Sequence, residues 1–139
     1  MKKLDITKLS KASSKNIKIG ELTQEIIDLL NLDLKPQNIN MWSTRIEEHC
    51  LKHKDEYSSI QAYQQAISSI PLIIKEPDYI GLHSKNGNLQ FIKKLDDISL
   101  VGIQIIHGSN SNLLFRTIFP ITQEKLNYSI KKRKIHFIS

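Results

Sequence analysis

The sequence predicts an α+β domain, with N-terminal helices followed by an antiparallel β-meander and a C-terminal helix. Up to residue 70, apolar residues recur mostly at helical spacing, and after it they alternate at strand spacing between short turns. Helices gathered before hairpin-linked strands are typical of the α+β class. Because 139 residues is the size of one domain, we expect a single domain over residues 18–139, preceded by a flexible arm over residues 1–17.

The first helix is predicted to begin after Thr23, whose hydroxyl suits a helix N-cap. Its apolar side would comprise Ile26, Ile27, Leu29 and Leu30. Residues 35–42, "KPQNINMW", are expected to form a short extended segment. The next helix would open at Ser43 or Thr44 and carry the stretch "RIEEHCLKHKDEY".

A further helix is predicted to begin at Asp55 or Ser58 and to end at Pro71 or just before it. Its apolar residues recur at helical spacing at Ile60, Tyr63, Ala66, Ile67 and Ile70. Beyond this helix, residues 72–81 form an apolar segment that Pro77 confines to a sheet edge or a turn.

Residues 85–88, "KNGN", predict a hairpin turn, because Asn-Gly pairs favour the tight turns that join antiparallel strands. Strands are expected at residues 89–95, 98–106 and 112–119. Thr122 can then cap a helix over residues 122–134. Residues 134–139 can form a closing strand.

The charge balance is compatible with a polyanionic partner such as RNA or DNA. Lysine and arginine number 20 against 14 acidic residues, giving a net charge of +6 and a pI of about 9.4. Lysine-rich proteomes show the same excess in proteins that bind no nucleic acid. No apolar run approaches the roughly 18 residues that span a bilayer, and no apolar signal-peptide region follows the basic start. The single cysteine excludes an intramolecular disulfide, so we expect a cytoplasmic protein without a membrane span.

Two histidines, His49 and His53, lie four residues apart and would share the apolar stripe of a helix. They could be packing residues, metal ligands, or an acid and a base. A zinc site would need a third ligand such as His83 or His107, and the glutamate that follows the first histidine of zincin helices is replaced by Cys50. Because Cys50 falls in the same stripe, packing is favoured over a nucleophilic role.

The stretches "IPLIIKEPDYIG", "NLQFIKKLDD" and "LLFRTIFPITQEKLNYSIKK" follow "RIEEHCLKHKDEY" in that order. Together, over residues 38–133, they resemble a phage-borne nuclease family of the barnase–EndoU–colicin–RelE (BECR) ribonuclease superfamily. Its members pair a His-x-x-x-His helix, followed by an acidic residue or proline, with a "PDYIG" segment and an "R-T-x-[YF]-P" strand. Here "DEYSS" follows Lys54 with no proline, so the sequence departs from that part of the pattern.

The resemblance implies a BECR-like RNase fold, a toxin-like activity on RNA without metal or other cofactor, and an origin in a phage or mobile element. Such an enzyme turns the 2′-hydroxyl onto the adjacent phosphorus, which needs a base and an acid. It also needs cationic or hydrogen-bonding groups on the phosphorane oxygens. We expect His53 and His49 to transfer protons and Arg116 to bind phosphate. The hydroxyl of Thr117 would hold a phosphate or satisfy the backbone.

Arg116 stands in the apolar strand "LLFRTIF". On an ideal strand it would share its face with Ile118, whereas Thr117 would point the other way unless a bulge near Pro120 changed its facing. A charge on such a face must line a cleft or be paired. Phosphate binding is therefore weighed against an internal salt bridge, for example with Glu47 or Glu48.

Six further residues are predicted to contact RNA: Tyr79, Lys93, Lys94, Lys131, Lys132 and Arg133. The tyrosine could stack on a base and the cations could lie along the phosphate backbone. The alternatives are a hydrophobic anchor for Tyr79, ordinary solvated side chains for the two lysines of "FIKK", and cations favoured by a helix C-terminus for "KKR".

A second hypothesis belongs to another class of function. The same fold could be a catalytically silent RNA- or protein-binding module that inhibits or regulates a host defence or replication system. A protein inhibitor or a host protein is therefore expected as a partner beside RNA.

Overall fold

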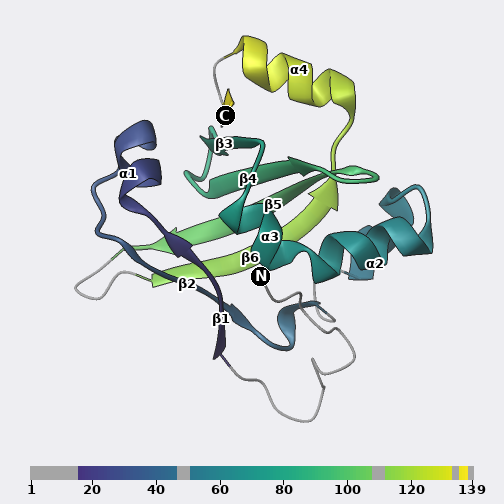
Figure 1. Cartoon of the computed structure of the whole chain (residues 1–139), viewed down its shortest axis with the longest axis horizontal. Coiled ribbons are helices and arrows are strands. Elements are labelled where there is room, and N and C mark those ends of the chain that lie inside the picture. The colour runs from purple at the N-terminus through teal and green to yellow at the C-terminus, as the bar shows by residue number, and fades with distance from the viewer. Residues whose placement is uncertain (1–15, 47–50, 108–111, 133–134, 138–139) are drawn as a thin grey trace.

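The computed structural model describes residues 16–46, 51–107, 112–132 and 135–137, and Figure 1 shows how their elements are arranged. In chain order the elements are β1 (Asn16–Leu22), α1 (Gln24–Leu30), β2 (Gln37–Trp42), the 3₁₀-helix η3 (Leu51–Glu56), α2 (Ile60–Ser68), α3 (Ile70–Lys75), β3 (Tyr79–Leu82), β4 (Leu89–Lys94), β5 (Ile98–Ile106), β6 (Asn112–Pro120), α4 (Gln123–Lys131) and β7 (Ile135–Phe137). The mixed α+β class, the meander, the helix capped by Thr122 and the closing strand are confirmed.

The prediction that helices open the domain is wrong. β1 precedes α1 and pairs antiparallel with β2, with Asn16 opposite Trp42 and Leu22 opposite Gln37. A register shift between Lys18 and Gly20 places a bulge in β1. The bulge puts the buried Ile19 and Leu22 three residues apart, which obscures the period of two by which strands are recognised. β1 begins at Asn16, within the range 1–17 that was predicted to be a flexible arm. Residues 1–15 lie outside the described part of the chain, so for them the flexible arm stays a prediction.

The described strands form one seven-stranded sheet in the order β1-β2-β6-β5-β4-β3-β7. The pairs β3–β4, β4–β5 and β5–β6 are antiparallel neighbours in sequence, as a meander requires. The pair β2–β6 is parallel, with Ile39 opposite Leu113. This parallel pair joins the antiparallel pair β1–β2 to the meander, so β6 lies inside the sheet rather than at its edge.

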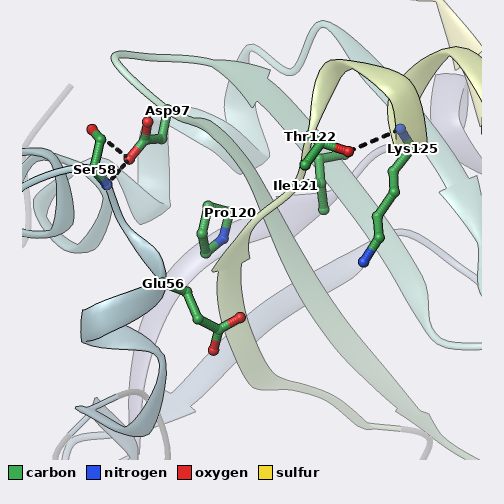
Figure 2. A pocket seen from close by; sticks show the side chains of 7 residues that line it. All are labelled: Glu56, Ser58, Asp97, Pro120, Ile121, Thr122 and Lys125. Atoms are coloured by element: carbon green, nitrogen blue, oxygen red, sulfur yellow. Dashed lines mark hydrogen bonds between the residues drawn. The ribbon is translucent and has the colours of Figure 1, made fainter.

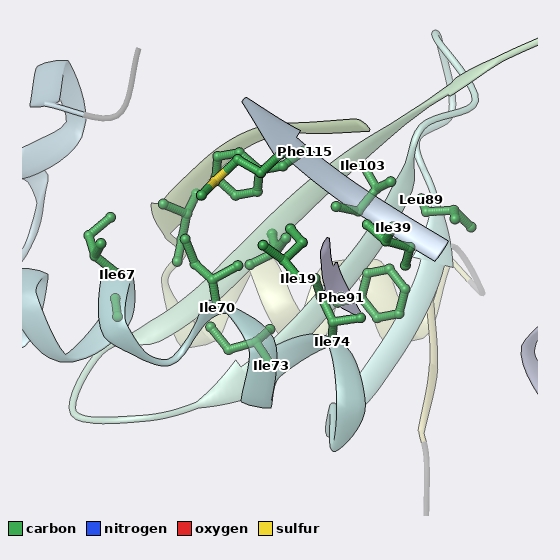
Figure 3. Close-up of a cluster of buried hydrophobic side chains, with 14 of the residues drawn as sticks. Ile19, Ile39, Ile67, Ile70, Ile73, Ile74, Leu89, Phe91, Ile103 and Phe115 are labelled. Carbon is green, nitrogen blue, oxygen red and sulfur yellow. The ribbon is translucent and has the colours of Figure 1, made fainter. Parts of the chain in front are cut away.

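One face of the sheet is covered by a large apolar core, which Figure 3 shows in close-up. The core joins α2 and α3 to the inner strands, and Ile67, Phe91 and Ile103 are among its fully buried side chains. Each fully buried side chain of this size stabilises the fold by about 1.5–3 kcal/mol relative to exposure. Most of the buried apolar residues among the described ones belong to this core, so packing on this face supplies most of the hydrophobic stabilisation.

Residues 70–75 form the helix α3, whereas residues 72–81 were expected to be extended up to an edge or a turn. The apolar side chains at Ile70, Ile73 and Ile74 are spaced three and four apart, and all are buried against the sheet. Pro71 does not disturb this helix, because it lies in the first turn, where no backbone N–H is needed. The strand itself is β3, which begins only at Tyr79.

Gly20 allows α3 to approach β1 closely. A Cβ atom built on Gly20 would lie 2.6 Å from Cγ2 of Ile74, closer than two carbon atoms can pack. The absence of a side chain at this position is therefore part of how α3 seats on the sheet.

The opposite face of the sheet carries a much smaller apolar cluster beneath α4. Its buried members among the described residues are Ile92, Leu100, Leu126 and Ile135. Consecutive residues of β4 supply both cores, because Phe91 belongs to the large cluster and Ile92 to the small one. Figure 1 shows α4 lying apart from α2 and α3. None of the described helices is long and apolar enough to cross a membrane.

Candidate active site

His53 lies on η3, a 3₁₀-helix, in the stretch where the sequence pattern predicted a helix with two histidines on one face. A 3₁₀-helix has three residues per turn, so positions i and i+3 are superimposed along its axis. Glu56 therefore stands over the same side of η3 as His53. His49 and Cys50 lie outside the described residues, as do the two glutamates before them, so the roles predicted for them stay predictions.

The imidazole of His53 is in contact with two side chains. Its Nδ1 atom meets Oε2 of Glu56. Its ring lies 5.6 Å from the ring of Phe119 between centroids, with the planes tilted by 38°. The side chain is 23% exposed, and that of Glu56 is 50% exposed. His53 is thus held in one place while part of it still reaches the surface.

The chain that follows η3 is tied to the sheet by two polar contacts. The hydroxyl of Tyr57 lies 3.1 Å from Oγ of the fully buried Ser99 on β5. The backbone N–H and the hydroxyl of Ser58 both donate to Oδ2 of Asp97, at 2.7 and 3.0 Å. Because Asp97 lies in the turn between β4 and β5, these bonds fix the end of η3 against the meander.

Arg116 occupies a β-bulge in the middle of β6. Thr117 pairs with Gly102 and Phe115 pairs with Ile103, so Arg116 is the extra residue on its strand. Its side chain is exposed, and among the described residues no ion pair or hydrogen bond of its guanidinium is seen. Its carbonyl oxygen accepts a hydrogen bond of 2.8 Å from Nε of Arg45. The glutamates named as ion-pair partners for Arg116 lie outside the described residues.

The bulge changes which residues of β6 share a face. Arg116 and Ile118 would share one on an ideal strand, but Ile118 is fully buried in the large core whereas Arg116 is exposed. The bulge lies at Arg116 in the middle of β6, and not near Pro120, where one was considered from the sequence. Thr117 packs beside Gly102, where a built Cβ atom would lie 3.2 Å from Cγ2 of Thr117. Its Oγ1 is buried and has no hydrogen-bond partner among the described residues.

Thr117 and Phe119 point to the face of the small cluster. Phe119 pairs with Leu100 of that cluster, and residues two apart on a strand share a face. Since His53 packs on Phe119, the structure brings His53 and Thr117 to one side of β6. No contact between His53 and the Arg116 side chain is seen among the described residues, although Arg116 and Phe119 are only three residues apart, about 10 Å along a strand.

A surface pocket of about 470 Å³ lies beside this arrangement. Figure 2 shows its lining side chains, which are Glu56, Ser58, Asp97, Pro120, Ile121, Thr122 and Lys125. Glu56 borders it from η3 and Lys125 from α4, while Pro120 and Ile121 lie between them. The pocket thus has opposite charges on two sides and apolar residues between them. One of the two charged residues, Glu56, is the residue that contacts His53.

The residues predicted to bind RNA on β3 and β4 do not all lie on the same face of the sheet. Lys94 lies with its Nζ 5.8 Å from the ring centre of Tyr79, which packs against the small cluster. The neighbouring Lys93 instead donates from Nζ to the carbonyl of Glu76, at 2.7 Å. Successive strand residues point to opposite faces, so Lys93 and Lys94 do not form one track.

Two of the last three predicted RNA-binding residues, Lys131 and Lys132, lie at the end of α4. Lys131 is exposed, and Lys132 has its Nζ 5.8 Å from the ring centre of the exposed Tyr128. Arg133 lies outside the described residues. Within the described parts of the chain, no group of three or more histidine, cysteine, aspartate or glutamate side chains could hold a metal ion.

The comparisons with known proteins supply a family. The family described as phage-Barnase-EndoU-ColicinE5/D-RelE like nuclease 3 matches residues 17–128. The chain belongs to this nuclease family. Neither the search of curated proteins nor the search of solved structures found a match. The family confirms the resemblance drawn from the sequence motifs, and the matched range contains η3, β6 and the pocket.

Sequence reasoning on this phage-type nuclease missed Glu56, Arg45 and Lys125. Glu56 could have been found, because it stands three residues after His53 and such pairs meet on a helix. Arg45 and Lys125 had no such signal. Arg45 reaches a strand 71 residues away, and Lys125 borders the pocket only because α4 follows β6 around Pro120.

Proposed function

We propose that this chain is an endoribonuclease that cleaves RNA without a metal, by attack of the 2′-hydroxyl on the adjacent phosphorus. In this proposal His53 and His49 act as the base and the acid, one taking the proton of the 2′-hydroxyl and the other protonating the leaving 5′ oxygen, and Arg116 binds the phosphate. Membership of a nuclease family supports phosphodiester cleavage as the class of reaction. RNA as the substrate, the mechanism, the cytoplasmic location and a protein inhibitor are the finer parts of the proposal.

The observation that carries the proposal is the setting of His53. The imidazole is held between Glu56 and Phe119 and is still partly exposed beside a pocket. Imidazole is the side chain best suited to exchange protons near neutral pH. A histidine that served only packing would not need a carboxylate on Nδ1 or an open side.

Arg116 suits the second role because its guanidinium is exposed on the strand that also carries Phe119. The planar guanidinium fork matches the oxygens of a phosphate. Its backbone is held by Arg45 through the carbonyl of the bulge, which fixes where the side chain starts. The hydroxyl of Thr117 is next in the chain and is buried without a hydrogen-bond partner among the described residues. In the proposal it bonds a phosphate oxygen or the neighbouring backbone.

The path of the RNA strand would continue from β6 toward β4. Pro120 pairs with Ser99, and Ile98 pairs with Lys94, so these positions lie at the same end of the sheet. Two strand spacings separate β6 from β4, about 10 Å. Lys94 and its neighbour Tyr79 would then contact the nucleotides flanking the cleaved bond through charge and stacking.

The test is cleavage of mixed cellular RNA by the purified protein in excess EDTA. We expect cleavage by the wild type, a loss of about 10²- to 10⁴-fold in His53→Gln, and about 10²- to 10³-fold in Arg116→Ala. His107→Gln, an exposed histidine at the end of β5, is the matched control and should keep full activity. Circular dichroism reports whether each variant is folded.

Two results would contradict the proposal. Cleavage that survives His53→Gln would exclude His53 as the proton carrier. No cleavage by a folded wild type would exclude the metal-free nuclease and favour the silent RNA- or protein-binding module on the same fold. Binding of labelled RNA, measured by its salt dependence, separates an RNA-binding module from a protein-binding one.

A further inference from the structure

Glu56 contacts one of the two ring nitrogens of His53. Its Oε2 meets Nδ1 of the imidazole, one turn along the 3₁₀-helix. A carboxylate is an acceptor only, whereas a neutral imidazole carries one N–H donor and one acceptor nitrogen. The contact is therefore favourable when the ring proton stands on Nδ1.

Among the charged groups described around the pocket, Glu56 is the one in direct contact with the imidazole of His53. From the other elements around the pocket, Asp97 uses its Oδ2 on Ser58, and Lys125 borders the far side with α4. Arg116 lies along β6 with no contact to the ring among the described residues. The other contact of the imidazole is the uncharged ring of Phe119.

We propose that Glu56 is a positioning residue that fixes His53 as its Nδ1–H tautomer and leaves Nε2 to exchange protons with the substrate. The reactive nitrogen would be selected by Glu56, and the ring plane would be set by Glu56 and Phe119 together. This orientation by a carboxylate is how a second group commonly prepares a histidine for chemistry. The role of Nε2 in proton transfer rests on the proposed function, whereas the tautomer is a property of the folded protein alone.

The attachment of η3 to the sheet supports this role. The end of the helix is tied through Tyr57 and Ser58 to the meander, so the carboxylate and the imidazole keep their relative positions without substrate. Glu56 also borders the pocket. A nucleotide that entered the pocket would therefore meet an imidazole already oriented, rather than one that must be turned.

Nitrogen-15 NMR of the histidine rings tests the tautomer without any assay of cleavage. At about pH 9 an imidazole is neutral, and the shifts of its two nitrogens report which one carries the proton. We expect Nδ1–H for His53 in the wild type and in Glu56→Gln, whose side-chain oxygen still accepts. We expect Glu56→Ala to lose that preference. Asp55→Ala, an exposed acid on the same helix, is the matched control and should leave the tautomer unchanged.

Kinetics then measure what the tautomer contributes. We expect Glu56→Ala to lower kcat by roughly 10- to 100-fold with little change in KM, and Glu56→Gln to restore most of that loss. A wild-type ring with its proton on Nε2, or a tautomer unaffected by Glu56→Ala, would overturn the inference. A correct tautomer in a protein that cleaves no RNA would overturn the proposed function while leaving the control of His53 by Glu56 in place.

Discussion

The two faces of the sheet differ in how completely they are packed. One face buries side chains of α1, α2 and α3 in a single large cluster. The other buries only four described residues between α4 and the sheet, with partly exposed side chains such as Phe119 and Ile121 around them. The large core stabilises the fold, and the thin one leaves the end of β6 accessible. The difference shows how a small chain combines stability with an open site.

The candidate site lies where the chain passes between these two faces of the sheet. Tyr57 is buried in the large core, while His53, four residues earlier, packs on Phe119 of the other face. η3 and the residue after it therefore pass from one face to the other beside β6. The well-packed face anchors the segment, and the thin face provides the partly exposed position for the imidazole.

The largest expected effect is a loss of stability when the well-packed face is disrupted. Phe91→Ala removes a fully buried ring from the large core and should lower the free energy of unfolding by about 3–5 kcal/mol. Phe119→Ala, on the thin face, should cost roughly 1–2 kcal/mol, because that ring is only partly buried. Urea denaturation followed by circular dichroism measures both.

The two variants should rank in the opposite order when cleavage activity is measured instead of stability. Phe119→Ala removes the ring on which His53 packs, so at temperatures where both variants are folded it should lose more cleavage than Phe91→Ala. Equal losses of stability in the two variants would contradict the division into a packed and a thin face.

A smaller loss of stability is expected where the segment after η3 is tied to the meander. Asp97→Ala removes the acceptor of two hydrogen bonds from Ser58 and should cost about 1–2 kcal/mol of stability. Hydrogen exchange of the Ser58 amide should become faster. Asp96→Ala, the exposed neighbour whose carboxylate has no described partner, is the control. Similar exchange in the two variants would show that Asp97 does not hold the segment.

The smallest effect concerns an exposed pair outside both cores. The side-chain hydrogen bond from Lys18, and then its charge, lower the pKa of Glu21 below its ordinary value of 4.5. A depressed carboxyl pKa contributes stability above the unfolded value, and this contribution is lost as the pH falls through the folded value. Lys18→Ala should return the pKa of Glu21 toward 4.5, as measured by NMR titration, with a change in stability too small to alter the fold. An unchanged pKa in this variant would exclude Lys18 as the cause.

The meander was predictable because its signals are local. Asn86-Gly87 predicts the hairpin, and Gly87 indeed takes a positive φ of 73°. Leu89 and Phe91 face one core and Ile92 the other, as alternation along a strand requires. Thr122 accepts a hydrogen bond from the amide of Lys125 and caps α4 as predicted.

The N-terminal half was less predictable because its elements depend on distant partners. β1 contains a bulge, and its pairing with β2 spans the whole of α1. α3 was mistaken for an extended segment because a short apolar run fits a buried helix and a strand alike. For the candidate site, the sequence pointed to His53, Arg116 and Thr117. It did not show that a bulge in β6 changes the faces to which Arg116 and Thr117 point, relative to an ideal strand.

Turn residues, caps and alternation predicted the α+β class, the hairpin and the cap of α4, because these signals act over a few positions. The nuclease family was indicated by the resemblance of several sequence motifs. The tertiary structure decided that β1 opens the sheet, that Arg116 occupies a bulge, and that Glu56 and Phe119 hold His53. These features depend on contacts between residues far apart in the chain, or on the three-residue turn of η3. Local pattern cannot supply them, because the free energy that selects them comes from packing that exists only once the chain has folded.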